Sequence, residues 1–315
     1  MIKSEFYYPS CDGVNQLHCV LWEPEGEEVK GVLQISHGMV EYIERYEYFA
    51  AQLTKAGYVV VGNDHLGHGK SVKEDDLGYF AKEEGSKKVV EDLYRITQKM
   101  KKKYEGFPYF VMGHSMGSFL IRRYIMTYGN EVDGVVIMGT GFQPAPVLGF
   151  GRLTVKVMKA LKGERYRSSL CDNLSFGSYN KRIKSARTTK DWLTKDEKIV
   201  DAYLNDPYCS FIFTLNGFET LLSTIAFIQD KKNIVKIPKK LPVFMVAGAE
   251  DPVGAYGKGV RKVYEIYRNN QIQDIEMKLY PGDRHELVNE LDRDVVCQDI
   301  LSWLEQRTHK THKMK

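Results

Sequence analysis

The sequence predicts an α/β fold, with a mostly parallel eight-stranded sheet, helices on both faces and a helical insertion. Two observations lead to this prediction. Short apolar runs, as expected of buried strands, alternate with stretches of helical periodicity through the first 140 residues. The same alternation resumes near Leu241 after a break. Because parallel strands need a crossover connection, usually a helix, such alternation is typical of a parallel sheet covered on both faces.

The individual elements follow from the pattern in chain order. Residues 5–10 and 15–23 predict two strands of an antiparallel hairpin, joined by a Cys-Asp-Gly-Val turn. The other strands are expected at 31–36, 58–61, 108–112, 135–138, 243–246 and 275–280. Helical patterns cover 45–56, 86–104, 116–128 and 256–268, and a last helix ends near Gln306.

The residues between 141 and 237 contain no clear β-α unit. We therefore expect a core formed by 1–140 and 238–308, a helical cap (or lid) formed by 141–237, and a flexible tail at 309–315. Within the cap, two stretches are distinctive: a basic amphipathic one at 147–162 and an aromatic, apolar one at 211–228.

The composition limits the classes of function. Lys plus Arg total 45 against 41 for Asp plus Glu, and this excess of +4 is too small to argue for a nucleic-acid partner. The five cysteines are scattered without CxxC spacing, which predicts no zinc site and no disulfide framework and favours the cytoplasm. The N-terminus has no signal-peptide pattern, and no apolar run of about 18 residues predicts a membrane span. The oligomeric state stays open.

A candidate nucleophile lies in Gly113-His114-Ser115-Met116-Gly117, the single G-x-S-x-G match in the chain. In this motif a serine sits on a strained turn between a strand and a helix, and the flanking glycines let both elements pack closely. A small-residue loop can match the pattern by chance. Here, however, strand 108–112 leads in and helix 116–128 leads out, which is the setting that the motif requires.

A serine nucleophile needs a base, and the base needs a carboxylate that orients it. His285 is the candidate base, because it alone among the histidines follows a strand after Ser115 and precedes a helix. The alternative is a solvated surface histidine. For the acid, the loop after strand 243–246 offers Asp251, with Glu250 as its nearest rival.

An oxyanion hole requires two backbone N–H donors. The turn at the nucleophile supplies that of Met116, and the loop after strand 31–36, Ser36-His37-Gly38-Met39, supplies that of Met39. We interpret His37 as a residue that orients this loop, not as the base.

These motifs resemble the monoglyceride lipase and lysophospholipase family of α/β hydrolases, grouped with serine aminopeptidases of the S33 type. The resemblance covers nearly the whole chain, and its cap is closer to bacterial members. It rests on Ser36-His37-Gly38-Met39, Glu44-Arg45-Tyr46, 63–71, GHSMG at 113–117, GAEDPVG at 248–254 and Arg284-His285-Glu286. The resemblance implies an α/β-hydrolase fold, a Ser115–Asp251–His285 triad, and oxyanion donors at Met39 and Met116.

The expected activity is hydrolysis of a carboxylic ester, of the monoacylglycerol or lysophospholipid type, without metal or cofactor. Cap aromatics either line an acyl pocket or form the cap's own core, and 147–162 either rests on a membrane or packs as an ordinary helix. Expected substrate contacts are His37, Gly38, His114, Phe211 and Phe213.

Three alternative functions stay open. An aminopeptidase would need a cap carboxylate for the substrate's amino group, for which Glu164, Asp172, Asp206 and Glu219 are candidates. A thioesterase would use the same triad, and a non-catalytic receptor would use the same fold.

Overall fold

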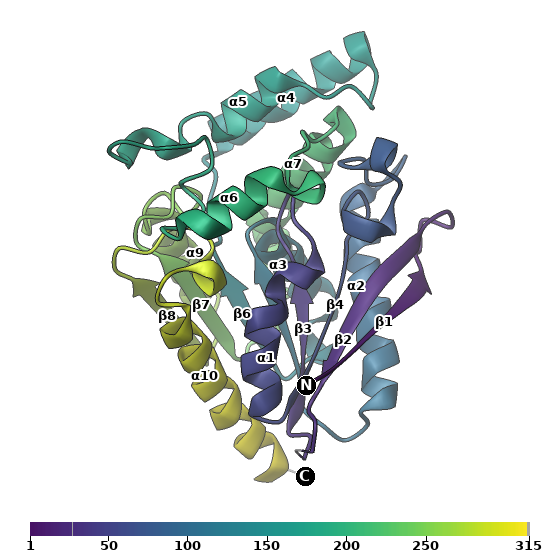
Figure 1. The fold of residues 1–315 in the computed structure, drawn as a ribbon, viewed down its shortest axis with the longest axis vertical. Helices are drawn as coiled ribbons and strands as arrows, with labels where there is room; N and C mark the ends of the chain where they lie inside the picture. Colours follow the sequence, from purple (N-terminus) through teal and green to yellow (C-terminus); the bar gives the residue numbers. More distant parts are fainter. Residues whose placement is uncertain (27, 314–315) are drawn as a thin grey trace.

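Eight strands form one sheet in the order β1-β2-β4-β3-β5-β6-β7-β8 (Figure 1). This computed structural model describes residues 1–26 and 28–313, and their side chains as far as Thr308. The strands are β1 (Ile2–Pro9), β2 (Gln16–Glu23), β3 (Gly31–Ser36), β4 (Tyr58–Asn63), β5 (Tyr109–His114), β6 (Gly134–Met138), β7 (Val243–Gly248) and β8 (Ile275–Tyr280). β1 and β2 pair antiparallel, as do β2 and β4, and the other neighbours are parallel. The predicted mostly parallel, eight-stranded sheet is confirmed.

Helices cover both faces of this sheet (Figure 1). They are α1 (Glu47–Lys55), α2 (Gly85–Lys103), α3 (Met116–Tyr128), α4 (Ala145–Lys162), α5 (Ser169–Phe176), α6 (Glu197–Asn205), α7 (Leu215–Gln229), α8 (Lys231–Ile234), α9 (Lys258–Asn269) and α10 (Arg293–Lys313). α1 and α10 share one buried cluster, through residues such as Phe49 and Ile300. α2, α3 and α9 share the cluster on the other face, through Leu93, Ile125 and Val263.

The register of the central strands places the site loops at one edge. Ser36 of β3 pairs with Gly113 of β5, and His114 of β5 pairs with Met138 of β6. The strands therefore end side by side, and the loops that follow them meet at the carboxyl edge of the sheet. In parallel α/β sheets this edge is where ligands bind.

Between β6 and β7, the described chain forms five helices, α4 to α8, and no strand of the sheet. In Figure 1, α4 and α5 lie across the top of the molecule, with α6 and α7 between them and the sheet. Polar contacts tie this segment, 141–237, to the rest: Tyr203 Oη donates to Val40 O at 2.9 Å, and Arg284 Nη1 donates to Asp191 O at 2.7 Å.

The last helix, α10, continues to Lys313, past Gln306 where the sequence pattern predicts its end. Its final turns are held by Arg307, which pairs with Asp274 and Glu276, and by Thr308, whose hydroxyl contacts Tyr58 Oη at 2.9 Å. Of the expected flexible tail, residues 314–315 lie outside the described residues. None of the helices in the described part of the chain combines the length and the hydropathy of a membrane span.

Candidate active site

Ser115 occupies a strained turn between β5 and α3. Its φ of +54° and ψ of −120° lie where L-residues are uncommon. The turn is sealed by close packing on both sides: a Cβ on Gly113 would lie 2.3 Å from Gly117 O, and a Cβ on Gly117 would lie 2.0 Å from Ser36 O. Only glycine fits either position, so the two glycines allow the close approach of β3, β5 and α3 that holds the serine at the edge of the sheet.

His285 and Asp251 come together from the loops after β8 and β7. His285 Nδ1 lies 3.0 Å from Asp251 Oδ2, and the two side chains are 2% and 0% exposed. The second carboxylate oxygen accepts a hydrogen bond from Val253 N at 2.8 Å, which fixes the orientation of the acid. The imidazole and the carboxylate are close but not aligned for a hydrogen bond. Such bonds in unliganded enzymes are often poorly aligned and tighten when substrate binds.

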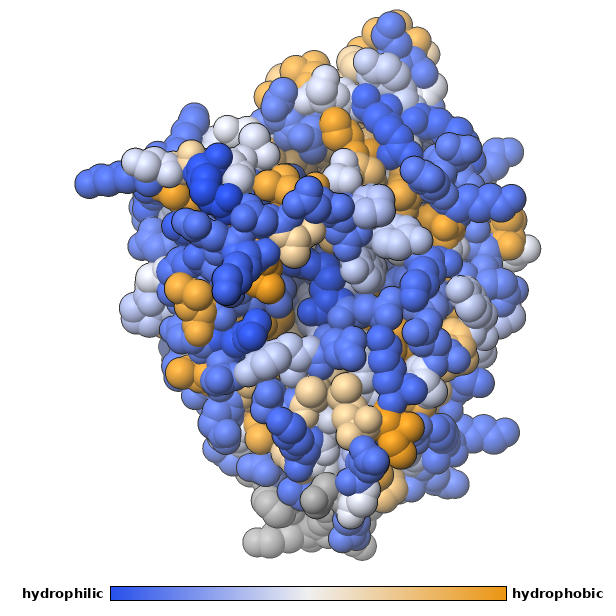
Figure 2. Space-filling view, viewed as in Figure 1, coloured by the Kyte–Doolittle hydropathy of each residue, from blue (hydrophilic) through white to orange (hydrophobic). Residues whose placement is uncertain are grey.

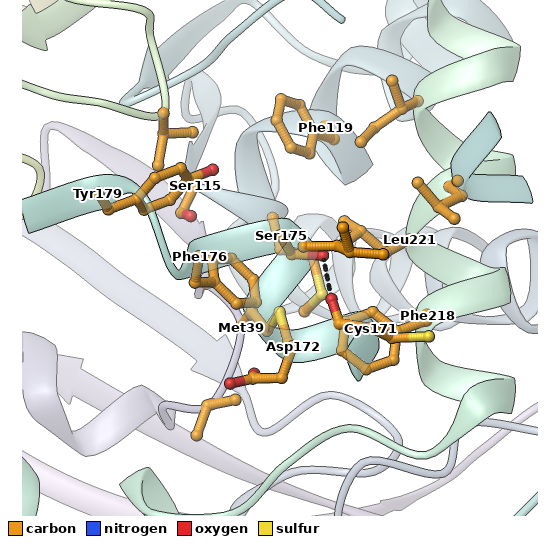
Figure 3. A pocket seen from close by; sticks show the side chains of 18 of the residues that line it. Met39, Ser115, Phe119, Cys171, Asp172, Ser175, Phe176, Tyr179, Phe218 and Leu221 are labelled. Atoms are coloured by element: carbon orange, nitrogen blue, oxygen red, sulfur yellow. Dashed lines mark hydrogen bonds between the residues drawn. The ribbon is translucent and has the colours of Figure 1, made fainter. Parts of the chain in front are cut away.

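Ser115 and His285 both line one cavity of about 310 Å³, named here the Ser115 cavity. Asp251 is not part of its wall and lies behind His285. No hydrogen bond joins the Ser115 and His285 side chains within the described part of the chain. In Figure 3, Ser115 and Tyr179 lie on one side of the cavity, and Leu221 and Phe218 lie on the other.

The two predicted oxyanion donors, Met39 and Met116, also line the Ser115 cavity. Met116 is the first residue of α3, and the first N–H groups of a helix have no intrahelical acceptor. Met39 follows Gly38, whose own N–H donates to Glu41 Oε1 at 2.5 Å. That bond ties the backbone of this loop to Glu41, which also lines the cavity.

Glu41 is the centre of a buried network that the sequence analysis did not identify. Besides Gly38 N, its carboxylate accepts hydrogen bonds from Tyr46 Oη at 3.0 Å and from Arg45 Nη1 at 2.9 Å. Arg45 in turn donates to both oxygens of Glu286, at 2.8 and 2.7 Å. The network therefore joins the loop after β3 to the residue that follows His285. Arg45 and Glu286 stand in the motifs quoted above, but they are 241 positions apart, so only the fold reveals their pairing.

His114, directly before Ser115, completes this network. Its Nδ1 lies 3.1 Å from Glu41 Oε1, and its Nε2 lies 3.2 Å from the backbone oxygen of His285. A carboxylate and a carbonyl oxygen can only accept, so both ring nitrogens must carry protons and His114 is an imidazolium. The two cations His114 and Arg45 then balance the two anions Glu41 and Glu286.

The pKa shifts agree with this assignment. Burial lowers the pKa of His114, but the hydrogen bond and the charge of Glu41 outweigh burial and raise it above its ordinary value. Burial raises the pKa of Glu41, but His114 and Arg45 hold it well below its ordinary value. Burial likewise opposes ionisation of Glu286, whose pKa is nevertheless lowered by Arg45. All of these shifts favour the charged forms of the groups.

The predicted substrate contacts divide into two groups. Gly38, His114 and Phe211 line the Ser115 cavity. His37 and Phe213 are fully buried and do not. His37 Nε2 accepts from His65 N at 2.9 Å, its Nδ1 contacts Gly38 O at 2.8 Å, and Phe213 packs against the ring of His68. Both residues therefore pack within the protein and do not reach the cavity.

The wall that segment 141–237 contributes is mostly apolar, with Leu148 and Val155 of α4 and Phe218, Leu221, Leu222 and Ile225 of α7. Of the four carboxylates considered for an amine site, Asp172 alone lines the cavity. The other three have partners elsewhere: Glu164 accepts from Tyr79, Asp206 accepts from Tyr42, and Glu219 pairs with Lys159.

Among the described residues, one group of carboxylates has the spacing of a metal site, formed by Asp283, Glu290 and Asp292. Lys195 Nζ lies 2.6 Å from Asp283 Oδ1 and 3.8 Å from Glu290 Oε2, so a lysine already supplies the positive charge there. These contacts tie segment 141–237 to the loop of His285.

Comparison with known proteins agrees with this geometry. The chain is 26% identical to the monoacylglycerol lipase of Mycolicibacterium smegmatis, over 96% of this chain and 97% of that protein. It is 27% identical to human monoglyceride lipase, over 93% of this chain and 88% of that protein. The crystal structure of a thermostable carboxyl esterase from Bacillus coagulans superposes with a TM-score of 0.90 at 28% identity, covering 98% of this chain and 99% of that one.

The fold of these relatives is that of α/β hydrolases, as the sequence predicted. The protein family described as Serine aminopeptidase, S33, matches residues 27–292, which is most of the chain. The strained serine, the histidine–aspartate pair and strands β3 to β8 all fall within that match. This chain therefore belongs to the S33 serine aminopeptidase family.

Proposed function

We propose that this protein hydrolyses carboxylic esters of lipids, of the monoacylglycerol or lysophospholipid type, through an acyl-enzyme on Ser115. The observation that carries the proposal is that a strained serine and a histidine backed by a buried aspartate open into one large apolar cavity. Hydrolysis of carboxylic esters is also the activity of the lipase and esterase relatives. The proposed assignments are Ser115 as nucleophile, His285 as base, and Asp251 as the acid that orients it.

In the proposed reaction, Ser115 Oγ attacks the ester carbonyl carbon while His285 takes its proton. The N–H groups of Met39 and Met116 stabilise the negative charge on the carbonyl oxygen. His285 then gives the proton to the departing alcohol, and a water molecule, activated by the same histidine, releases the fatty acid. The His114–Glu41 network supports both parts of the site, because it holds the oxyanion loop at Gly38 and the His285 backbone at once.

The apolar wall favours a lipid acyl group. Burial of each CH₂ of an acyl chain is worth about 0.8 kcal/mol, and α4 and α7 provide such a surface. We also propose that segment 141–237 is a cap that selects the substrate.

An amide hydrolase is the second candidate, because Asp172 lines the cavity and could bind a substrate's amino group. Lys190 lines the same wall, however, and its positive charge would repel that amino group. The ester is therefore the better proposal.

We further propose that α4 rests on an anionic lipid surface. Its outer face exposes Phe150, Leu153 and Leu161 to 63%, 60% and 73%, and such side chains on one helix form an unusually apolar surface. Arg152, Lys156 and Lys162 are exposed on the same helix, which fits negatively charged headgroups. Figure 2 shows apolar residues gathered toward this end of the molecule.

The five unpaired cysteines fit a cytoplasmic location.

The test is the Ser115→Ala variant, assayed on monoacylglycerol, a soluble p-nitrophenyl ester and an aminoacyl anilide. We expect hydrolysis of both esters to fall by about 10⁶-fold, as when other serine hydrolases lose their nucleophile, with the fold intact by circular dichroism. A fluorophosphonate probe should label the wild-type chain at Ser115. Retained esterase activity, labelling at another residue, or a preference for the anilide would contradict the proposal.

A further inference from the structure

One cation lines the Ser115 cavity without a counter-ion. The side chain of Lys190 belongs to the cavity wall, and no carboxylate in the described part of the chain lies within 4.0 Å of its Nζ. Other lysines of the same segment do have such partners: Lys159 Nζ lies 2.6 Å from Glu219, and Lys195 Nζ lies 2.6 Å from Asp283. Lysines of segment 141–237 that also lack such a partner, such as Lys156 and Lys198, are exposed to solvent, whereas Lys190 is partly buried in the cavity wall.

Aromatic rings fix the place of this ammonium group. Nζ lies 6.0 Å from the ring centre of Phe176 and 6.0 Å from that of Tyr203. Tyr203 is itself anchored, because its hydroxyl donates to Val40 O next to the oxyanion loop. Burial between these rings lowers the pKa of Lys190, and the charge of Asp172 opposes that shift only partly. A charge held in such surroundings is costly unless a ligand supplies the opposite charge.

The position of Lys190 relates it to the alcohol side of the ester. Two residues further on, Trp192 packs its ring against His285, with centroids 5.2 Å apart, and stacks on Phe176 at 6.4 Å. His285 is the group that protonates the departing alcohol in the proposed reaction. The apolar wall for the acyl chain is built from other elements, α4 and α7. The cavity wall thus has an apolar part from α4 and α7, and it has a cation, Lys190, on the stretch of chain that packs against His285 through Trp192.

We propose that Lys190 binds a phosphate carried by the alcohol part of the substrate, so that the enzyme prefers a lysophospholipid to a neutral monoacylglycerol. The inference rests on the proposed ester hydrolysis and adds to it a residue that sets head-group specificity. A lysine ammonium on a flexible stem is a common phosphate ligand, acting as a point charge.

The experiment compares two substrates with the same acyl chain, 1-octanoylglycerol and 1-octanoyl-glycerophosphoethanolamine, both kept monomeric so that no lipid surface contributes. In Lys190→Met, we expect kcat/KM for the phosphate-bearing ester to fall about 10- to 100-fold, as for loss of a hydrogen bond to a charged group. The kcat/KM for octanoylglycerol should fall much less, so that the ratio between the two substrates changes. The loss should appear mainly in KM, and the inhibition constant of the non-hydrolysable ether analogue should rise in parallel.

Two further variants are the controls. Lys198→Met removes one exposed lysine of α6 that is not part of the cavity, and it should leave the preference unchanged. Lys190→Arg keeps the charge and should restore most of the activity on the phosphate-bearing ester. Melting temperatures check that each variant is folded.

Three results for Lys190→Met would overturn this inference and leave the proposed function standing. The first is an unchanged substrate preference, and the second is an equal loss on both substrates. The third is weaker inhibition by octanoate, the acid product, with no change in hydrolysis of the lysophospholipid. The last would mean that Lys190 binds the acid product. Failure of the proposed function looks different, because the wild-type enzyme would then hydrolyse neither ester and would not react with a fluorophosphonate.

Discussion

The Ser115 cavity has two sides that are built in opposite ways: a floor, formed by the loops at the carboxyl edge of the sheet, and a roof, formed by the helices of segment 141–237. The floor is a set of buried polar groups, each fixed by a partner on a different element: Asp251 beside His285, and Glu41 beside His114. The roof is a set of helices whose apolar side chains are only partly covered, with Leu153 and Leu161 of α4 mostly exposed. Catalysis needs atoms held in place, whereas a lipid substrate needs an adaptable apolar surface.

This difference predicts how substitutions will act. A change in the floor should alter the rate on every substrate or the stability of the fold, because buried polar groups depend on one another. A change in the roof should alter which substrates are used and how the enzyme meets a lipid surface. The predictions below test this distinction, beginning with the largest effect.

Asp251→Asn should lower kcat by about 10⁴-fold, since an amide cannot stabilise the imidazolium of His285 and favours the wrong tautomer. The loss should be the same on short soluble esters and on monoacylglycerol, because the acid does not touch the substrate. The matched control is Glu250→Gln, one residue earlier and exposed, which should leave kcat unchanged. Equal activity of Asp251→Asn and wild type, or a large loss in Glu250→Gln, would reverse the choice between these two acids.

The sequence contains enough information for the elements that hold the floor. The elbow at Ser115 could be predicted because its requirements are local: a strand before it, a helix after it, and glycines on each side. The strands could be predicted because five of them, β3 to β7, are buried along their whole length and read as continuous apolar runs.

Other features depend on distant residues and could not be predicted. Glu41, Arg45 and Glu286 become a network only when the loop after β3 meets the loop after β8. Phe211 and Phe213 are residues of the same type only two positions apart, yet Phe211 lines the cavity and Phe213 is fully buried outside its lining. Helical periodicity in 147–162 identifies an apolar face, but it does not say whether that face meets protein, lipid or water.

Glu41→Gln should destabilise the fold by about 3 kcal/mol, because it leaves the buried His114 cation without its carboxylate. It should also lower kcat/KM, since the amide keeps one accepting oxygen where the carboxylate has two, and Gly38 N must then compete with the other donors to Glu41. Chemical denaturation and ester kinetics measure both effects. The control is Glu84→Gln, which breaks an exposed pair with Lys87 and should cost less than about 1 kcal/mol. A fully stable Glu41→Gln variant would show that the network does not hold the floor.

The same network predicts the pH dependence of stability. Folding raises the pKa of His114 above its ordinary value of 6.5, so its contribution to stability is complete below that pH and is lost as the pH rises through the raised pKa. Folding lowers the pKa values of Glu41 and Glu286 below 4.5, so their contribution is complete above that pH and is lost as the pH falls through the lowered values. His114→Asn should remove the alkaline part of this dependence, measured as unfolding free energy against pH, and an unchanged alkaline slope would contradict the imidazolium assignment.

The smallest effect on the folded enzyme is expected at the roof. Leu153→Ser combined with Leu161→Ser changes two exposed side chains of α4 that do not line the Ser115 cavity, so stability and hydrolysis of a soluble ester should not change. Binding to vesicles that contain anionic lipid should weaken by about 10-fold or more, because two apolar side chains no longer enter the lipid. The control is Val14→Ser, which removes an exposed apolar side chain from the turn between β1 and β2. If both variants bind vesicles as the wild type does, the exposed face of α4 does not contact lipid. If the α4 variant instead loses activity on soluble esters, roof and floor are coupled, and the division between them fails.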